Sequence, residues 1–233
     1  MSSDATSSNQ FGSIASFHLV RHRSRVGALA HLAVGRRHLK ATPGLTFWRL
    51  LGTGSGSDTG PGADLARTAL FAIWRDPDDL DRFLDGYCTD AAERWHVRLR
   101  ARGGHGAWRG RAVLDELAPA VATDGEVAII TRAHVRARHW RRFRAAGPQV
   151  SAELQRAEGL LAVVGIGEAP VGNLGTFSLW RSAADAAAFA RDQPFHRDVV
   201  RRTRVESWYG EELFARFEPF DSAGRWDGRD PLG

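Results

Sequence analysis

The sequence is poor in cysteine and lysine. Cys88 is the only cysteine, which excludes an intramolecular disulfide and any zinc or iron–sulfur site that needs several thiolates. Lys40 is the only lysine, so the net charge of +5 comes almost entirely from arginine. A basic chain suits an anionic partner, such as nucleic acid, a membrane surface or an acidic protein. Arginine without lysine is equally what a biased genome produces, so the charge by itself selects none of these partners.

Long apolar runs are also missing. The longest, residues 160–166, is far shorter than the roughly 20 residues of a membrane-spanning helix. Residues 1–12 are rich in Ser, Asn and Asp and lack the basic and apolar regions of an export signal, so we expect them to be disordered. The sequence therefore predicts a cytoplasmic protein, either soluble or in peripheral contact with a membrane.

One order of predicted elements occurs twice along the chain. The first half has strand 13–20, helix 25–40, strand 45–51, a glycine-rich loop 52–62, strand 67–74 and a helical region from 76 to about 98. The second half has strand 126–135, helix 138–156, strand 160–166, a turn 167–175, strand 176–180 and helices from residue 183 onward. The two halves match element for element, which indicates an internal duplication.

Short motifs support the duplication. The segment 71–75, Phe-Ala-Ile-Trp-Arg, recurs at 177–181 as Phe-Ser-Leu-Trp-Arg, 177 − 71 = 106 residues later, and Phe83 maps to Phe189 at the same offset. We predict an α+β fold of two ferredoxin-like β-α-β-β-α-β repeats, residues 13–122 and 123–233. Together they form an intramolecular version of the dimeric α+β barrel, a scaffold whose cavity between sheet and helices holds apolar ligands.

A short helix in the second repeat carries the strongest candidate for chemistry, His196. Asp192 is a suitable N-cap, and Pro194 suits the first turn. Positions three, four and seven residues after His196 are apolar or small, so the imidazole lies on the inward face of the helix; these are Val199, Val200 and Thr203. Such a histidine is either a hydrogen-bonded core residue or a cofactor ligand. At an offset of 106, the first repeat has Asp90 instead, so we expect a site in the second repeat alone.

Other motifs favour simpler interpretations. The loop 52–62 lacks the Lys-Ser/Thr of a P-loop, and we interpret it as a flexible connection. No nucleophile elbow and no H-E-x-x-H motif is present. The segment 132–144 interleaves arginines with Trp140 and Phe143, which is typical of an amphipathic helix with a solvated basic face, so we expect no nucleic-acid partner. This face also suits an acidic electron-donor protein or an anionic membrane surface.

Six motifs in order resemble the spheroidene monooxygenase family over residues 13–232; they are Phe47-Trp-Arg-Leu-Leu-Gly-Thr-Gly54, Gly165-Ile-Gly-Glu168, Thr176-Phe-Ser-Leu-Trp180, Phe195-His196, Trp208-Tyr-Gly-Glu-Glu-Leu-Phe-Ala-Arg-Phe217 and Trp226-Asp-Gly228. The resemblance implies a haem-containing oxygenase, and the family enzyme oxidises the end of an acyclic carotenoid to a ketone. The chain is also similar to the wider ferredoxin-like haem proteins, including chlorite dismutases and aldoxime dehydratases, in which a helix histidine of one repeat binds the iron. Arg49 and Val163 depart from the family pattern, which often has lysine at both places, and they leave open whether the substrate is a carotenoid or another natural product.

The resemblance also implies roles for particular residues. His196 would bind the iron of haem b, iron protoporphyrin IX, and Phe195, Val199 and Val200 would pack against the cofactor. On the opposite side, Arg132 is a candidate to bond bound oxygen or a haem propionate, and Ser178 and Glu168 are candidates to bond ligand or substrate; all three are predicted catalytic residues. The implied partners are a hydrophobic small-molecule substrate, dioxygen and an acidic electron donor, and we expect a homo-oligomer.

Three other functions remain open at the sequence level. In a haem-dependent dehydratase or lyase, ferrous iron would bind the substrate directly and no electrons would be consumed. A non-catalytic haem-binding module would have both axial positions filled by the protein. A cofactor-free oxygenase on the same scaffold would be a colourless protein.

Overall fold

This computed structural model of the chain describes residues 12–54, 63–120, 124–168 and 172–233, and for residues 194–196 it describes the backbone alone. The first repeat contains β1 (Ile14–Arg21), α1 (Arg25–Ala41), β2 (Leu45–Gly54), β3 (Ala63–Trp74), α2 (Pro77–Gly86), β4 (Glu93–Gly106) and the short 3-10 helix η1 (Val113–Glu116). The second contains β5 (Val127–Val135), the 3-10 helix η2 (Ala137–His139), α3 (Trp140–Gln155), β6 (Leu160–Glu168), β7 (Asn173–Trp180), α4 (Ala183–Asp192), α5 (Pro194–Val205) and β8 (Tyr209–Gly224).

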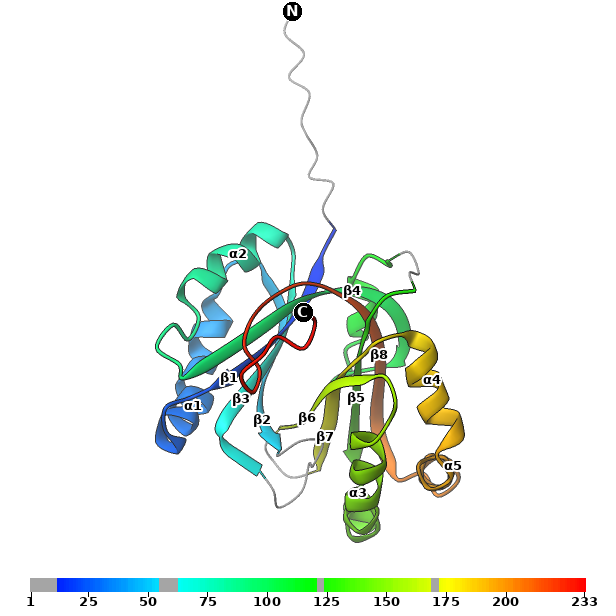
Figure 1. Cartoon of the computed structure of the whole chain (residues 1–233). Helices are drawn as coiled ribbons and strands as arrows, with labels where there is room; N and C mark the ends of the chain where they lie inside the picture. Colours follow the sequence, from blue (N-terminus) through cyan, green and yellow to red (C-terminus); the bar gives the residue numbers. More distant parts are fainter. Residues whose placement is uncertain (1–11, 55–62, 121–123, 169–171) are drawn as a thin grey trace, which may run out of the picture.

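The strands close into one barrel, in the order β1-β3-β2-β6-β7-β5-β8-β4, and every pair is antiparallel. The repeats join at β2–β6 and at β4–β8. Helices α1 and α2 cover the outside of one half of the barrel, and α3, α4 and α5 lie outside the other half (Figure 1). This architecture confirms the predicted α+β barrel built from two ferredoxin-like units.

Two predicted elements are wrong, and in both cases the last strand of a repeat was missed. In the second repeat, the helices expected from residue 183 onward end at Val205, and β8 follows over Tyr209–Gly224. The helical region expected from 76 to about 98 ends at Gly86, and β4 begins at Glu93. Buried side chains alternate along β4, with Trp95, Val97 and Leu99 directed into the barrel core, which is the two-residue period of a strand. The strands around the two predicted loops are also longer than expected. Of those loops, residues 55–62 and 169–171 lie outside the described part of the chain.

Aromatic side chains fill the inside of the barrel. At its centre, the rings of Phe17 and Phe177, one from each repeat, stack with their centroids 3.8 Å apart and an interplanar angle of 3°. Trp108 stacks on Phe71 at 5.5 Å, while Trp226 packs near Trp95 and Phe177. Because β4 and β8 run antiparallel, the two tryptophan-containing segments that follow them close opposite ends of the barrel. The barrel is therefore a packed core and not a channel.

Matching turns complete the two ends. The turns Trp108–Arg111 and Trp226–Arg229 each have positive φ at both central residues, a conformation that favours glycine and asparagine-like residues. The carboxylate of Glu211 accepts the N–H of both central residues of the first turn, at 2.8 and 2.5 Å. Glu93 does the same for the second turn, at 3.1 and 2.7 Å. Glu211 lies near the start of β8, and the turn it binds follows β4; Glu93 lies at the start of β4, and the turn it binds follows β8. We call these contacts the Glu211 clamp and the Glu93 clamp. Because β4 and β8 belong to different repeats, each clamp ties one repeat to the other.

Helix α5 is an insertion in the second repeat. The offset between equivalent residues is 180 − 74 = 106 for Trp74 and Trp180, but 211 − 93 = 118 for Glu93 and Glu211. The difference is 12 residues, which is the length of α5. Asp90 therefore lies in the short connection between α2 and β4, and pairing it with His196 was wrong, because the first repeat has no helix at that point.

We predict that Phe177→Ala lowers the free energy of unfolding by about 3–5 kcal/mol, because it leaves a void at the centre of the barrel. Equilibrium unfolding in guanidinium, followed by tryptophan fluorescence, measures this change. Val205→Ala is the matched control. Its side chain is exposed, and the change should stay within about 0.5 kcal/mol. A loss below about 1 kcal/mol for Phe177→Ala would contradict a central role for the stack.

Candidate functional site

The first repeat fills the space between its sheet and its helices. Helix α1 packs directly on β2 and β3. Beneath α1 and α2, Leu70, Trp74, Leu80 and Phe83 form part of a buried apolar cluster. Apolar side chains thus fill the layer between sheet and helices in the described part of this half, and the expectation that the site lies in the second repeat alone stays a prediction.

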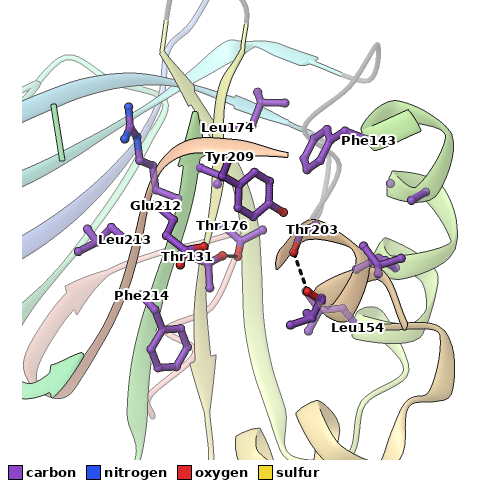
Figure 2. Close-up of a pocket in the computed structure, with 18 of the residues that line it drawn as sticks. Thr131, Phe143, Leu154, Leu174, Thr176, Thr203, Tyr209, Glu212, Leu213 and Phe214 are labelled. Atoms are coloured by element: carbon purple, nitrogen blue, oxygen red, sulfur yellow. Dashed lines mark hydrogen bonds between the residues drawn. The ribbon is translucent and has the colours of Figure 1, made fainter. Parts of the chain in front are cut away.

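The second repeat leaves this space open. Helix α3 packs against α5 and contacts the sheet at β6, and its residues Phe143 and Leu154 also reach β8 and the apolar cluster on β5 and β7. Helix α4 packs on β7 and α5. Between these helices and the outer face of β5, β7 and β8 lies a cavity of about 470 Å³. Figure 2 shows Thr131, Thr176, Glu212 and Phe214 on the sheet side and Leu154 and Thr203 on the helix side. The volume lies within the range of cofactor and small-molecule sites, roughly 300–1,000 Å³.

Most of the cavity wall is apolar; the apolar lining residues are Ala133, Phe143, Ala146, Val150, Leu154, Leu174, Ala190, Val199, Val200, Leu213 and Phe214. Gly147 of α3 also lines it, and a Cβ added there would meet no atom within 4 Å. An apolar wall of this kind suits a hydrophobic molecule and disfavours bound water.

A few polar groups lie on the sheet side. The hydroxyls of Thr131 and Thr176 are hydrogen-bonded to each other at 2.8 Å. Glu212 lies beside them in Figure 2, with its carboxylate 3.9 Å from the imidazole of His105. Tyr209, the first residue of β8, also lines the cavity. Burial raises the pKa of its phenol to about 12, so the phenol stays protonated at neutral pH. The cavity thus offers neutral hydroxyls and one carboxylate.

Two arginines of α5, Arg197 and Arg204, also line the cavity. Arg197 donates to the backbone oxygen of Arg191 at 3.4 Å, and neither guanidinium is paired with a carboxylate in the described part of the chain. Both residues are exposed, so they lie at the rim of an otherwise apolar site. Free guanidinium groups at such a rim suit the carboxylates of an amphipathic ligand.

The structure brings part of the predicted cofactor set to this cavity. Val199 and Val200 line it, and Thr203 beside them is buried and donates to the backbone oxygen of Val200 at 2.8 Å. The side chains of Phe195 and His196 lie outside the described residues. The roles predicted for these four residues, including iron ligation by His196, stay predictions.

Arg132 lies where the cavity meets the end of the barrel. Its guanidinium is buried and donates to Glu211 and, at 2.7 Å, to the side-chain oxygen of Asn173. Its Nε atom has no hydrogen-bond partner among the described residues. Arg132 thus contributes to the Glu211 clamp and keeps one free donor, and its predicted catalytic role stays a prediction.

Glu168 and Ser178 do not line the large cavity. Glu168 accepts from the indole N–H of Trp108 and from Arg109 at 2.7 Å, and Arg49 lies 4.0 Å away. Ser178 accepts from the indole N–H of Trp180 at 3.0 Å. Both side chains are bonded to protein groups, which is a sufficient structural role, and their catalytic roles stay predictions.

Sequence reasoning missed the polar residues of the sheet wall. Thr131 lies two residues from Ile129 and Ala133, so strand alternation already placed it on the helix-facing side. By the same rule, Thr176 and Ser178 lie on one face of β7, because they are two residues apart. Glu212 and His105 had no such signal, because the pairing of β4 with β8 brings them together.

The described residues contain no group of three or more His, Cys, Asp or Glu side chains that could hold a metal ion. Among the described helices, none has the length and hydropathy needed to cross a membrane.

Several spheroidene monooxygenases are similar to the chain. It is 32% identical to that of Rubrivivax gelatinosus over 213 residues, which cover 88% of this chain and 81% of the relative. It is 30% identical to that of Rhodobacter capsulatus over 211 residues, 88% of each protein, and 28% identical to that of Cereibacter sphaeroides over 224 residues, 93% of this chain and 69% of the relative. No protein-family model matches the chain.

Crystal structures of aldoxime dehydratases share the fold. One, in complex with butyraldoxime, has a TM-score of 0.59 at 13% identity and covers 90% of this chain and 80% of its own. Another has a TM-score of 0.55 at 16% identity, with 90% of this chain and 82% of its own covered.

The Glu211 clamp predicts a pH dependence of stability. Partial burial by itself raises the pKa of the Glu211 carboxyl, but the backbone N–H groups of Gly110 and Arg109 and the guanidinium of Arg132 outweigh it and lower this pKa below its ordinary value near 4.5. When the pKa of a carboxyl is lower in the folded state than in the unfolded state, the carboxylate stabilises the protein at pH values above the unfolded-state pKa. This stabilisation is lost as the pH falls through the folded-state pKa. We expect Glu211→Gln to cost about 1–3 kcal/mol at pH 7 and progressively less in acid.

Urea unfolding between pH 7 and pH 3 measures this difference, with Glu158→Gln, whose side chain is 92% exposed, as the control. A constant gap between wild type and Glu211→Gln over the whole pH range would contradict the linkage.

Proposed function

Because the chain belongs to the spheroidene monooxygenase family, we propose that it is a haem-dependent monooxygenase that oxidises a hydrophobic small molecule of the carotenoid type with dioxygen. Membership of the family makes the chain an oxidoreductase of the monooxygenase kind. The observation that carries the finer proposal is the apolar cavity between the helices and the sheet of the second repeat.

The residues of this cavity fit a haem. Its walls are apolar, its volume is that of a cofactor site, and Gly147 leaves open space where a side chain would stand. Arg197 and Arg204 at the rim are suited to hold two propionate carboxylates. The described residues offer no cluster of metal ligands, and a porphyrin brings four of its own and needs a single protein donor.

The position of residue 196 on α5 supports its assignment as that donor. Cavity-lining residues of α5 are spread over an arc of the helix surface; they are Arg197, Val199, Val200, Thr203 and Arg204. At 100° per residue, position 196 lies near the middle of this arc, one turn before Val199 and Val200 and two turns before Thr203. Helix α5 is also the insertion that distinguishes this repeat from the first, so ligand and cavity would have arisen together.

The chain's own residues would prepare the site for oxidation of a C–H bond. When bound, a haem with one protein ligand supplies the activation of dioxygen. The apolar residues of β7, β8 and α3 would orient a hydrophobic substrate and keep water out. Thr131 and Thr176 would offer hydrogen-bond donors on the sheet side, where Glu212 can accept or relay a proton.

Electrons would come from a separate donor protein. The exposed arginines of η2 and α3, among them Arg138, Arg141 and Arg144, form a basic surface on the helices that cover the cavity. A donor with an acidic surface would be guided to this surface by charge.

A dehydratase is the second candidate, because two aldoxime dehydratases share the fold over 90% of this chain. The two functions differ in what they consume. A monooxygenase needs dioxygen and reductant for every turnover, whereas a dehydratase turns over anaerobically without a stoichiometric reductant. Turnover of a carotenoid and of an aldoxime, each assayed with and without oxygen and reductant, distinguishes them.

We predict that His196→Ala abolishes haem binding or weakens it at least about tenfold, since removal of an axial ligand costs more than 1.4 kcal/mol. Absorption spectra of the purified proteins, including the ferrous–CO forms, measure binding and identify the ligand type. His38→Ala, which changes an exposed histidine of α1, is the control. A thiolate-type spectrum would point to Cys88, and unchanged binding in His196→Ala would refute the assignment.

A second variant tests the cavity without removing the histidine. We expect Gly147→Leu to fold normally, because its Cβ meets open space, and to weaken haem binding at least about tenfold, because the new side chain extends into the site. Gly86→Leu is the matched control, since an added Cβ there also meets no atom within 4 Å and Gly86 lies outside the cavity. Haem titration followed at the Soret band reports both. Equal affinities in the two variants would place the cofactor elsewhere.

A further inference from the structure

Helix α1 turns an apolar face to solvent. Val26, Leu29 and Val34 are 76%, 56% and 65% exposed, and Ala30 and Ala33 lie exposed between them. These five positions follow the spacing i, i+3, i+4, i+7 and i+8, so they form one continuous stripe along the helix. The opposite face, which includes Ala28 and Leu39, is the one buried against the sheet. The stripe is therefore not required for the core of the protein.

Basic residues bracket this stripe at both ends. Arg23 and Arg25 lie at the N-terminal end, and Arg36, Arg37 and Lys40 at the C-terminal end. Helix α1 contains no Asp or Glu from residue 25 to residue 41. In the ranges that the structure describes, none of the five cations is paired with a carboxylate; Arg23 donates only to the backbone oxygen of Asp90. The face thus combines an apolar centre with free positive charge around it.

We propose that this face of α1 docks on an anionic lipid bilayer. Apolar side chains would enter the boundary between headgroups and acyl chains, and the flanking cations would bind lipid phosphates. Charge complementarity favours this occupant over a second copy of the chain. Two α1 stripes packed together would bring basic ends against basic ends in either orientation, with no acid of the helix to compensate.

The fold makes such docking compatible with the cavity. Helix α1 belongs to the first repeat, and α3 and α5, which cover the cavity, lie outside the other half of the barrel (Figure 1). A membrane bound at α1 therefore does not need to displace any helix that lines the cavity. This inference is independent of the identity of the cofactor.

Flotation of the full chain with vesicles tests the proposal. We expect binding to vesicles of phosphatidylcholine with phosphatidylglycerol, weak binding to phosphatidylcholine alone, and loss of binding at high salt. The double variant Arg36→Gln/Arg37→Gln should weaken binding about thirtyfold, from about 1 kcal/mol for each cation near the surface. The triple variant Val26→Ser/Leu29→Ser/Val34→Ser removes the apolar anchor with no loss of charge and should weaken binding at least about tenfold.

The matched control is Arg141→Gln/Arg144→Gln, which removes two exposed cations from α3 instead and should retain binding. Circular dichroism and tryptophan emission check that each variant is folded. Failure of the wild type to bind anionic vesicles would overturn the proposal, as would equal losses in the α1 and α3 variants. A dimer in sedimentation velocity that only the triple variant dissociates, without vesicle binding, would assign the stripe to a second copy of the chain.

Discussion

The packed interior of the barrel is the constraint on which the rest of the structure depends. Phe17 from one repeat stacks on Phe177 from the other, and a tryptophan closes each end. Neither repeat could remain alone without exposing the edges of its sheet, and the pairing of β2 with β6 and of β4 with β8 satisfies those edges. Among the described residues, side chains fill the inside of the barrel, and the cavity of about 470 Å³ lies on the outside of the sheet, under the helices.

The two repeats use that outer face differently. In the first, α1 lies directly on the sheet, and an apolar cluster around Trp74 and Phe83 fills the layer. In the second, the 12 residues of α5 are inserted before the last strand, α3 packs on α5, and a cavity remains. Of two units with the same order of elements, one thus has a filled layer under its helices and the other has a cavity there, and it is this cavity that we propose as the site of the oxygenase.

Polar residues at the end of the barrel connect the fold to the cavity. Glu211 holds a turn of the first repeat and also receives a hydrogen bond from Arg132 of the second. Arg132 in turn reaches the boundary of the cavity, which Glu212, the neighbour of Glu211, also lines. A change in this network would affect stability and the cavity wall together, so the two effects have to be measured separately. In contrast, the basic and apolar surface of α1 lies apart from this network and from the cavity.

The duplication, most of the strands and helices and the existence of α5 were accessible from the sequence, because period and repeated motifs are local signals. These signals located the helix of His196 and placed Val199 and Val200 on one face. The predicted N-cap of α5 was wrong, because Asp192 is the last residue of α4 and Gln193 takes the capping position. The boundary of β4 was missed although Trp95, Val97 and Leu99 alternate there, because the acidic helix before it was extended too far. Arg132, Glu168 and Ser178 were selected as polar residues on strands expected to face the cavity, and only the structure showed which protein groups they bond.

The sequence by itself determined most of the strands and helices, though not β4 and β8, and it determined that the chain is a duplicated α+β protein, since these features depend on neighbours a few residues apart. Tertiary structure alone decided that the apolar face of α1 points to solvent and that a cavity remains between the sheet and the helices α3 and α5. It also decided that Thr131, Thr176, Glu212 and His105 share one wall. These arrangements depend on which distant strands pair and on which helices pack against the same face of the sheet. A pattern of neighbouring residues in the sequence does not contain that information.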